Sequence, residues 1–174
     1  MPGLDQLPSK DWGKSASSVI QPVLLSRGTL ESTDLARTRL LCEEVLGFQC
    51  APLGPDRLIL RHRSDRPGSI YWVLDVRAVA DMRSPQHMTN HWGIWVPSRG
   101  HVDAAYALLN ANKEKYGLLR VQHPRPTHEG ARDYSFYFED VSHVWWEIGE
   151  HPDEDEFMEL FGHGDWDVRT GATT

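Results

Sequence analysis

The chain contains the same order of predicted elements twice. In the first copy an apolar-rich run at 23–31 precedes Ser32 or Thr33, either of which can cap a helix that ends at Gly47. In the second copy the strand HWGIWV at 91–96 precedes a Ser cap and a helix that ends at Gly117. Strands after each helix are predicted over residues 48–53, 57–62 and 69–76 and over residues 118–122, 134–138 and 143–148. A repeat of about 60–70 residues, each copy a sheet with one helix, predicts an α+β fold of two βαβββ modules with mixed sheets.

The repeat also divides the chain. We expect a flexible N-terminal arm over residues 1–21, a first module over 22–78, a linker over 79–89 and a second module over 90–150. Residues 151–174 form an acidic C-terminal tail, for which a short amphipathic helix packed on the body is expected.

Composition excludes several classes of function. The 174 residues carry a net charge of −7 with acids and bases intermixed, so no basic surface for nucleic acid or an anionic membrane is predicted. Apolar runs are far shorter than the ~20 residues that span a bilayer, and the polar start lacks the apolar segment of a signal peptide. Cys42 and Cys50 are too few for a disulfide framework and are predicted to be reduced thiols. We therefore expect a cytoplasmic protein.

Two residues of the second module are candidate metal ligands. His91 opens its first strand, and Glu147 lies in its last strand within the apolar run WWEI. A carboxylate in an apolar strand is costly to bury unless a cation holds it. A neutral imidazole and a carboxylate on one sheet can supply two ligands of an open metal site.

Two more residues are candidates for acid–base chemistry. Tyr137 lies ten residues before Glu147, in the strand predicted to pair with that of Glu147, so a hairpin brings both to one face. A phenol can donate a hydrogen bond to an oxyanion. His128, on the preceding loop, can transfer protons near neutral pH.

These residues resemble a known family. The repeated unit, the segment RGTLESTDLARTRLLCEEVLGF, the strand NHWGIWV and the run YSFYFEDVSHVWWEI resemble the vicinal oxygen chelate superfamily of glyoxalases, bleomycin resistance proteins and type I extradiol dioxygenases. The resemblance implies that the two sheets curl around a ligand cup with metal ligands on its inner wall. It implies His91 and Glu147 as ligands, Tyr137 as a hydrogen-bond partner of substrate oxygen, and His128 as a contact to substrate or oxygen intermediates.

Position 27 departs from the family pattern, because Arg27 stands where the superfamily carries a first metal ligand. An arginine stays protonated and cannot donate a lone pair to a metal. Three arrangements remain open: another residue (Glu31, Asp75 or His87) is the third ligand; His91 and Glu147 hold the metal with substrate or water; or no metal binds and Arg27 pairs with Glu147 or with an anionic ligand.

Aromatic side chains crowd the strands of the second module and suit a flat substrate. The candidate substrate contacts are Arg27, Trp92, Tyr134 and Trp145. Strand alternation puts Trp145 on the face of Glu147.

Three functions follow from these residues. The first is an extradiol-dioxygenase-like metalloenzyme that uses Fe(II) or Mn(II) and O₂ on a phenolic or catecholic small molecule, with His128 and Tyr137 as catalytic groups. The second is a metal-free member that binds or transforms an aromatic ligand through Arg27, His128 and Tyr137. The third is a glyoxalase-like metal-dependent isomerase or lyase. A homodimer is compatible with all three.

Overall fold

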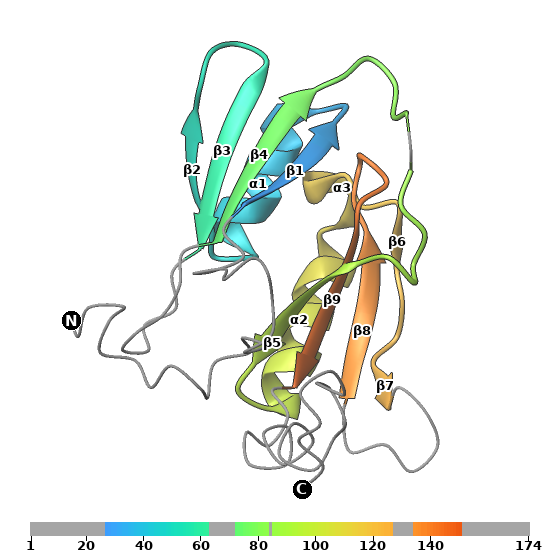
Figure 1. The fold of residues 1–174 in the computed structure, drawn as a ribbon. Helices are drawn as coiled ribbons and strands as arrows, with labels where there is room; N and C mark the ends of the chain where they lie inside the picture. Colours follow the sequence, from blue (N-terminus) through green and yellow to red (C-terminus); the bar gives the residue numbers. More distant parts are fainter. Residues whose placement is uncertain (1–26, 63–71, 84, 127–133, 151–174) are drawn as a thin grey trace, which may run out of the picture.

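The computed structural model describes residues 27–62, 72–83, 85–126 and 134–150, which form two sheets and the helices beside them (Figure 1). The first module contains β1 (Arg27–Ser32), α1 (Leu35–Glu44), β2 (Gln49–Pro52), β3 (Arg57–His62) and β4 (Trp72–Ala78). The second contains β5 (Trp92–Val96), α2 (Arg99–Ala111), α3 (Lys113–Tyr116), β6 (Arg120–Val121), β7 (Arg125–Pro126), β8 (Tyr134–Glu139) and β9 (Trp145–Glu150).

The two sheets have the same strand order. The first runs β1-β4-β3-β2 and the second runs β5-β9-β8-β6, with β7 paired to β8. In each module the first strand is parallel to the last, and the other neighbouring strands are antiparallel. The predicted α+β fold of two βαβββ modules with mixed sheets is confirmed.

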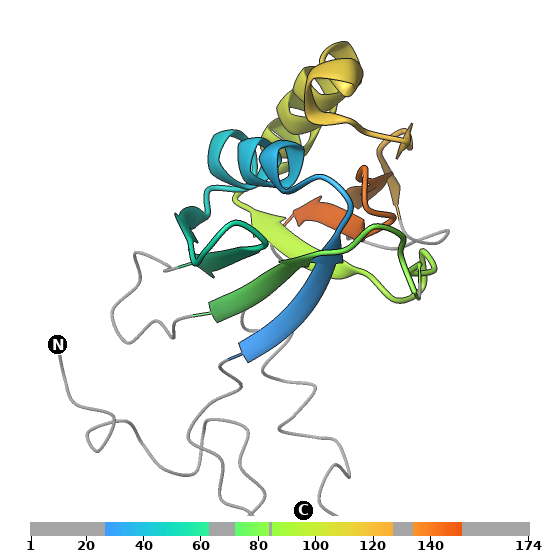
Figure 2. The same ribbon diagram turned by 90° about the horizontal axis from the view of Figure 1, so that it is seen from above.

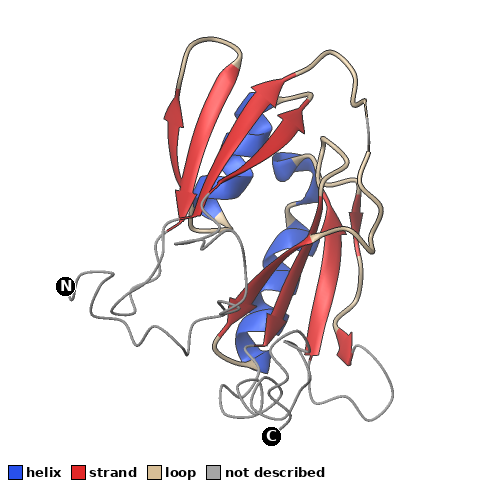
Figure 3. Cartoon of the chain, in the orientation of Figure 1, coloured by secondary structure: helices blue, strands red, loops and turns tan. Residues whose placement is uncertain are grey.

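Helices cover one face of each sheet, and none of the described helices lies on the opposite face (Figures 2 and 3). The helix-covered faces carry the alternate apolar residues that strand geometry places on one side. The largest fully buried apolar side chains of this core are Leu41, Leu60, Leu74, Val76, Val102, Leu109, Phe136, Phe138 and Trp146. The remaining alternate positions lie on what we call the helix-free face of each sheet.

Local details differ from the prediction at the start of α1. The cap is Asp34, whose side chain accepts a hydrogen bond from the backbone N–H of Arg37 at 3.0 Å. Ser32, one of the two predicted caps, instead lies 2.8 Å from the hydroxyl of Thr38. The end also differs from the prediction, because α1 ends at Glu44 with Val45 as its C-cap, and Gly47 lies beyond it with a φ of 72° that glycine adopts without strain.

The second helix also differs, because it breaks at Asn112 into α2 and α3 before Gly117 ends it in the left-handed region. Residues 125–126, which lie between the strands predicted at 118–122 and 134–138, form the short strand β7. Residues 79–83 and 85–89 of the predicted linker contain neither helix nor strand. The predicted arm and tail lie outside the described residues.

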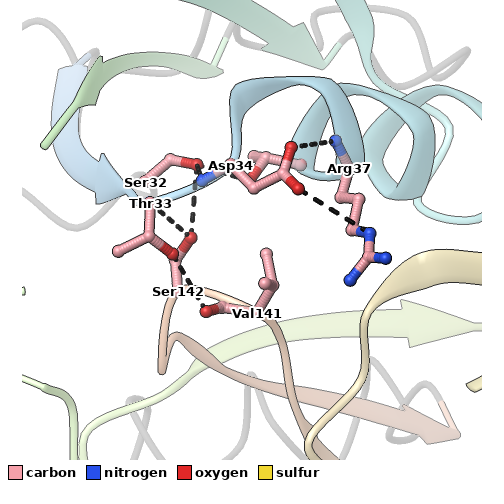
Figure 4. Close-up of polar contacts among 7 residues, drawn as sticks. Ser32, Thr33, Asp34, Arg37, Val141 and Ser142 are labelled. Atoms are coloured by element: carbon pink, nitrogen blue, oxygen red, sulfur yellow. Dashed lines mark hydrogen bonds and ion pairs between the residues drawn. The ribbon is translucent and has the colours of Figure 1, made fainter. Parts of the chain in front are cut away.

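The two modules are joined at the β1–α1 corner (Figure 4). The hydroxyl of Ser142, in the turn between β8 and β9, accepts from the backbone N–H of Thr33 at 3.1 Å and donates to the hydroxyl of Ser32 at 3.2 Å. The hydroxyl of Thr33 donates to the carbonyl of Val141 at 3.1 Å. The turn that connects the two strands of the site is therefore fixed to the other module.

None of the helices in the described ranges has the length and apolar character needed to cross a membrane.

Candidate functional site

The structure brings His91 and Glu147 together on the helix-free face of the second sheet. Glu147 of β9 pairs with Gly93 of β5, and His91 lies two residues before Gly93. Nε2 of His91 lies 2.9 Å from Oε2 of Glu147. The two side chains are 25% and 21% exposed, so water and small solutes reach a pair that is otherwise enclosed.

The hydrogen bonds of the His91 ring fix which nitrogen carries a proton. Nδ1 lies 2.7 Å from the backbone carbonyl of Met88, and a carbonyl only accepts, so Nδ1 is the donor. In the neutral ring Nε2 then presents its lone pair to a carboxylate oxygen of Glu147. Two acceptors at this distance need a positive charge between them, which is either a shared proton or a metal ion. A metal-binding histidine commonly donates its other N–H to a carbonyl in this way.

Tyr137 completes the cluster. It pairs with Glu147 across β8 and β9, and its ring stands edge-on to that of His91 with centroids 4.9 Å apart. Beside them Gly93 leaves room, because a Cβ at that position would lie 3.8 Å from Oε2 of Glu147. The predicted meeting of Tyr137 and Glu147 on one face is therefore present, and His91 joins them.

A segment that the sequence did not single out holds this cluster in place. The backbone N–H of Gln86 donates to the carbonyl of His143, and its side-chain oxygen accepts from the backbone N–H of Trp145, both at 3.2 Å. The side-chain amide of Gln122 lies 2.9 Å from the sulfur of Met88. These contacts fix the chain that presents the Met88 carbonyl to His91, and a backbone carbonyl leaves no signal in the sequence.

The sequence left open a third ligand beside His91 and Glu147. Among the described residues there is no group of three His, Cys, Asp or Glu side chains that could hold a metal. The three alternatives have other partners: Glu31 accepts from a backbone N–H at 3.3 Å, Asp75 accepts twice from Arg57, and His87 contacts Thr89 at 2.9 Å. In the described ranges, His91 and Glu147 therefore form a pair of potential donor side chains with no third His, Cys, Asp or Glu grouped with them.

Of two predicted site residues, the structure describes only the backbone of Arg27 and nothing of His128. Arg27 begins β1, where its backbone pairs with Val73, but its side chain lies outside what the structure describes. His128 lies outside the described residues altogether.

The predicted aromatic contacts divide between the two faces. Trp145 lies two residues before Glu147 in β9, so it is on the same helix-free face, and its side chain is buried. Trp92 packs against the core, with its ring against Gly28 of β1. The hydroxyl of Tyr134 donates to Asp103 of α2 at 2.9 Å, a bond that raises the pKa of this tyrosine. Trp92 and Tyr134 therefore do not share the face of His91, whereas Trp145 does.

The fold places the chain in a recognisable structural class. It has the fold of the vicinal oxygen chelate superfamily, which the sequence resembles. No known family model matches the chain, and no curated protein matches its sequence.

Several solved structures share this fold. A possible glyoxalase from Bacillus cereus is 21% identical, with 71% of this chain and 95% of that chain covered and a TM-score of 0.53. The fosfomycin resistance protein FosX from Listeria monocytogenes is 17% identical, with 78% and 96% covered and a TM-score of 0.56. A variant of that FosX, solved with Mn(II) and 1S,2S-dihydroxypropylphosphonic acid, is 17% identical, with 81% and 97% covered and a TM-score of 0.55. At these identities the likeness concerns the fold.

Proposed function

We propose that the chain is a metal-dependent enzyme that acts on a small molecule with two neighbouring oxygen atoms, with His91 and Glu147 as the metal ligands. One observation carries this proposal. Nε2 of His91 and Oε2 of Glu147 are 2.9 Å apart, while Nδ1 of the same ring is committed to the Met88 carbonyl. The pair is therefore preset to share a cation.

Each residue of the cluster has a part in this proposal. His91 offers a nitrogen lone pair and Glu147 a carboxylate oxygen to the metal. A bound divalent ion would polarise substrate oxygens. Tyr137 donates a hydrogen bond from its phenol to a substrate oxyanion, and Trp145 supplies an apolar wall on the same face.

The finer proposal is an extradiol-dioxygenase-like reaction on a phenolic or catecholic substrate, with Fe(II) or Mn(II) and O₂. The support is the pairing of Tyr137 with Glu147, the nearby ring of Trp145 and the resemblance in the run YSFYFEDVSHVWWEI. In this proposal His128 acts with Tyr137 in proton transfer. A metal with only two protein ligands leaves more positions for the substrate than one with three.

A metal-free function is the second candidate, and a specific observation favours it. Position 27 is an arginine, and no third ligand group joins His91 and Glu147 among the described residues. In this alternative the pair keeps a proton, and Arg27, His128 and Tyr137 bind or transform an aromatic ligand. The site then acts by hydrogen bonding and charge alone.

Metal binding and catechol turnover separate the two candidates. Metal-stripped protein is titrated with Mn(II) and, without oxygen, with Fe(II). The wild type is then assayed with substituted catechols under O₂. We expect one metal per chain, loss of binding in His91→Ala and Glu147→Gln, and no loss in His101→Ala, which removes an exposed histidine of α2. Arg27→His is expected to raise metal affinity, because it adds a nitrogen lone pair at the position where the superfamily carries its first metal ligand.

Two results would change the assignment. A wild type that binds no metal but still binds catechols saturably would establish the metal-free candidate. A metal-loaded wild type that leaves catechols unchanged would contradict the proposed dioxygenase activity but support the metal site.

A further inference from the structure

The helix-free face of the first sheet carries a compact charged cluster outside the site already described. Arg57 of β3 and Arg77 of β4 are directly opposite each other in the antiparallel pair. Asp75, two residues before Arg77 on the same face, accepts from Nε and Nη2 of Arg57 at 2.7 and 2.5 Å. Nη2 of Arg77 lies 3.6 Å from Oδ2 of Asp75.

We propose that Arg57 and Arg77 form a binding site for an oxyanion group of a small molecule, a carboxylate or a phosphate, with Arg77 as the principal contact.

The balance of charge supports this site. Two like charges directly opposite each other in a sheet destabilise it unless a counter-charge intervenes. Asp75, whose side chain is only 1% exposed, supplies that charge, and its hydrogen bonds raise the pKa of Arg57. Glu31 of β1 also lies on this face, opposite Arg77 in the parallel pair, and Arg61 of β3 lies on it two positions beyond the register partner of Asp75. Counted over β1, β3 and β4 from residue 28 on, Arg57, Arg61 and Arg77 therefore exceed Asp75 and Glu31 by one positive charge.

Of the two arginines beside Asp75, Arg77 is the more open to an anion from solvent. Its side chain is 60% exposed, and within the described part of the chain it donates no hydrogen bond. Arg57, by contrast, already donates two hydrogen bonds to the carboxylate of Asp75 in a bidentate ion pair. A guanidinium with free, forked N–H donors next to a second one matches the geometry of carboxylate and phosphate oxygens.

The internal repeat places this cluster at the position that corresponds to the His91–Glu147 pair of the second module. Asp75 pairs with Thr29 of β1 as Glu147 pairs with Gly93 of β5, so Asp75 is the counterpart of Glu147 in the first module. In the second module the carboxylate meets a histidine, whereas in the first it meets arginines. In the first module, arginines already neutralise Asp75, whereas in the second module a cation is proposed to bind between Glu147 and His91. The first module is therefore suited to bind an anion.

The test measures anion binding without any metal. Metal-stripped wild type is titrated with inorganic phosphate and, separately, with malonate, and binding is followed by calorimetry and by amide chemical shifts. We expect saturable binding of one equivalent, at least tenfold weaker in Arg77→Gln and partly retained in Arg77→Lys, which keeps the charge but loses the fork. The preferred probe tells a phosphate from a carboxylate ligand.

Two controls make the result specific. Arg39→Gln, which removes an exposed arginine paired with Glu43 on α1, should bind both probes like the wild type. His91→Ala should also bind them normally, so failure of the metal site leaves this test unaffected. Equal binding by wild type and Arg77→Gln, or no saturable wild-type binding below about 10 mM, would overturn the proposal.

Discussion

The ring of Trp92 lies across the backbone of β1 at Gly28, so the two modules meet through an indole and a glycine. A Cβ at position 28 would lie 3.1 Å from Cη2 of Trp92 and 2.9 Å from Cδ2 of the buried Leu74. Gly28→Ala is therefore expected to lower the free energy of unfolding by about 1–3 kcal/mol, because neither neighbour can move freely in a packed core. Denaturant titration measures this change.

Gly93 provides the matched control for that substitution. A Cβ there would meet only Oε2 of Glu147, at the ordinary contact distance of 3.8 Å. Gly93→Ala should change the unfolding free energy by less than about 1 kcal/mol. Equal effects at positions 28 and 93 would show that Trp92 does not pack on β1 as described.

The hydroxyl of Ser142 joins the β8–β9 turn to the first module. Ser142→Ala leaves the backbone N–H of Thr33 without its acceptor, and we expect a loss of about 1–2 kcal/mol in unfolding free energy. Thr89→Ala, which removes the hydroxyl of an exposed residue outside the helices and strands, should cost less than about 0.5 kcal/mol. If the two substitutions cost the same in thermal or denaturant unfolding, the turn is not held through this hydroxyl.

Asp75 is the buried partner of a cation. Asp75→Asn removes its charge while Arg57 and Arg77 stay opposite each other, and we expect a loss of about 2–3 kcal/mol, at the lower end for buried pairs because the arginines reach solvent. Glu43→Gln breaks an exposed pair with Arg39 and should cost less than about 0.5 kcal/mol. If Asp75→Asn leaves the unfolding free energy unchanged in denaturant titration, this carboxylate does not have the stabilising role described.

The two cysteines should react slowly in the folded protein. Burial, reinforced by the charge of Glu43, raises the pKa of Cys50 to about 11, and burial also raises that of Cys42. A raised thiol pKa lowers the thiolate fraction, so at pH 8 only about one Cys50 in a thousand is reactive. Labelling with a thiol reagent should be at least about a hundredfold slower in native than in unfolded protein. Rapid labelling of native Cys50 would show that it is not enclosed.

Much of the fold was predictable because its signals are local. Gly117 adopts the left-handed backbone that ends α3, and the alternation of strand residues shows which side faces the core. The meeting of Tyr137 with Glu147 was predictable for the same reason, since a hairpin fixes which residues pair.

The remaining features depend on partners far apart in the chain. Ser32 was a candidate cap for α1, but its hydroxyl is engaged by Thr38 and by Ser142, which lies 110 residues later, and Asp34 takes the cap. Asp75 was a candidate metal ligand, but strand pairing places it beside Arg57. Neither choice can be made from sequence spacing alone.

The central claim is that His91 and Glu147 share one cation. It is tested most directly by calorimetric titration of metal-stripped protein with Mn(II), run in parallel on the wild type, His91→Ala and Glu147→Gln. We expect one Mn(II) per wild-type chain and no binding in either variant, because each substitution removes one of the two protein ligands. Binding that survives both substitutions, or a wild type that binds no metal, would contradict it.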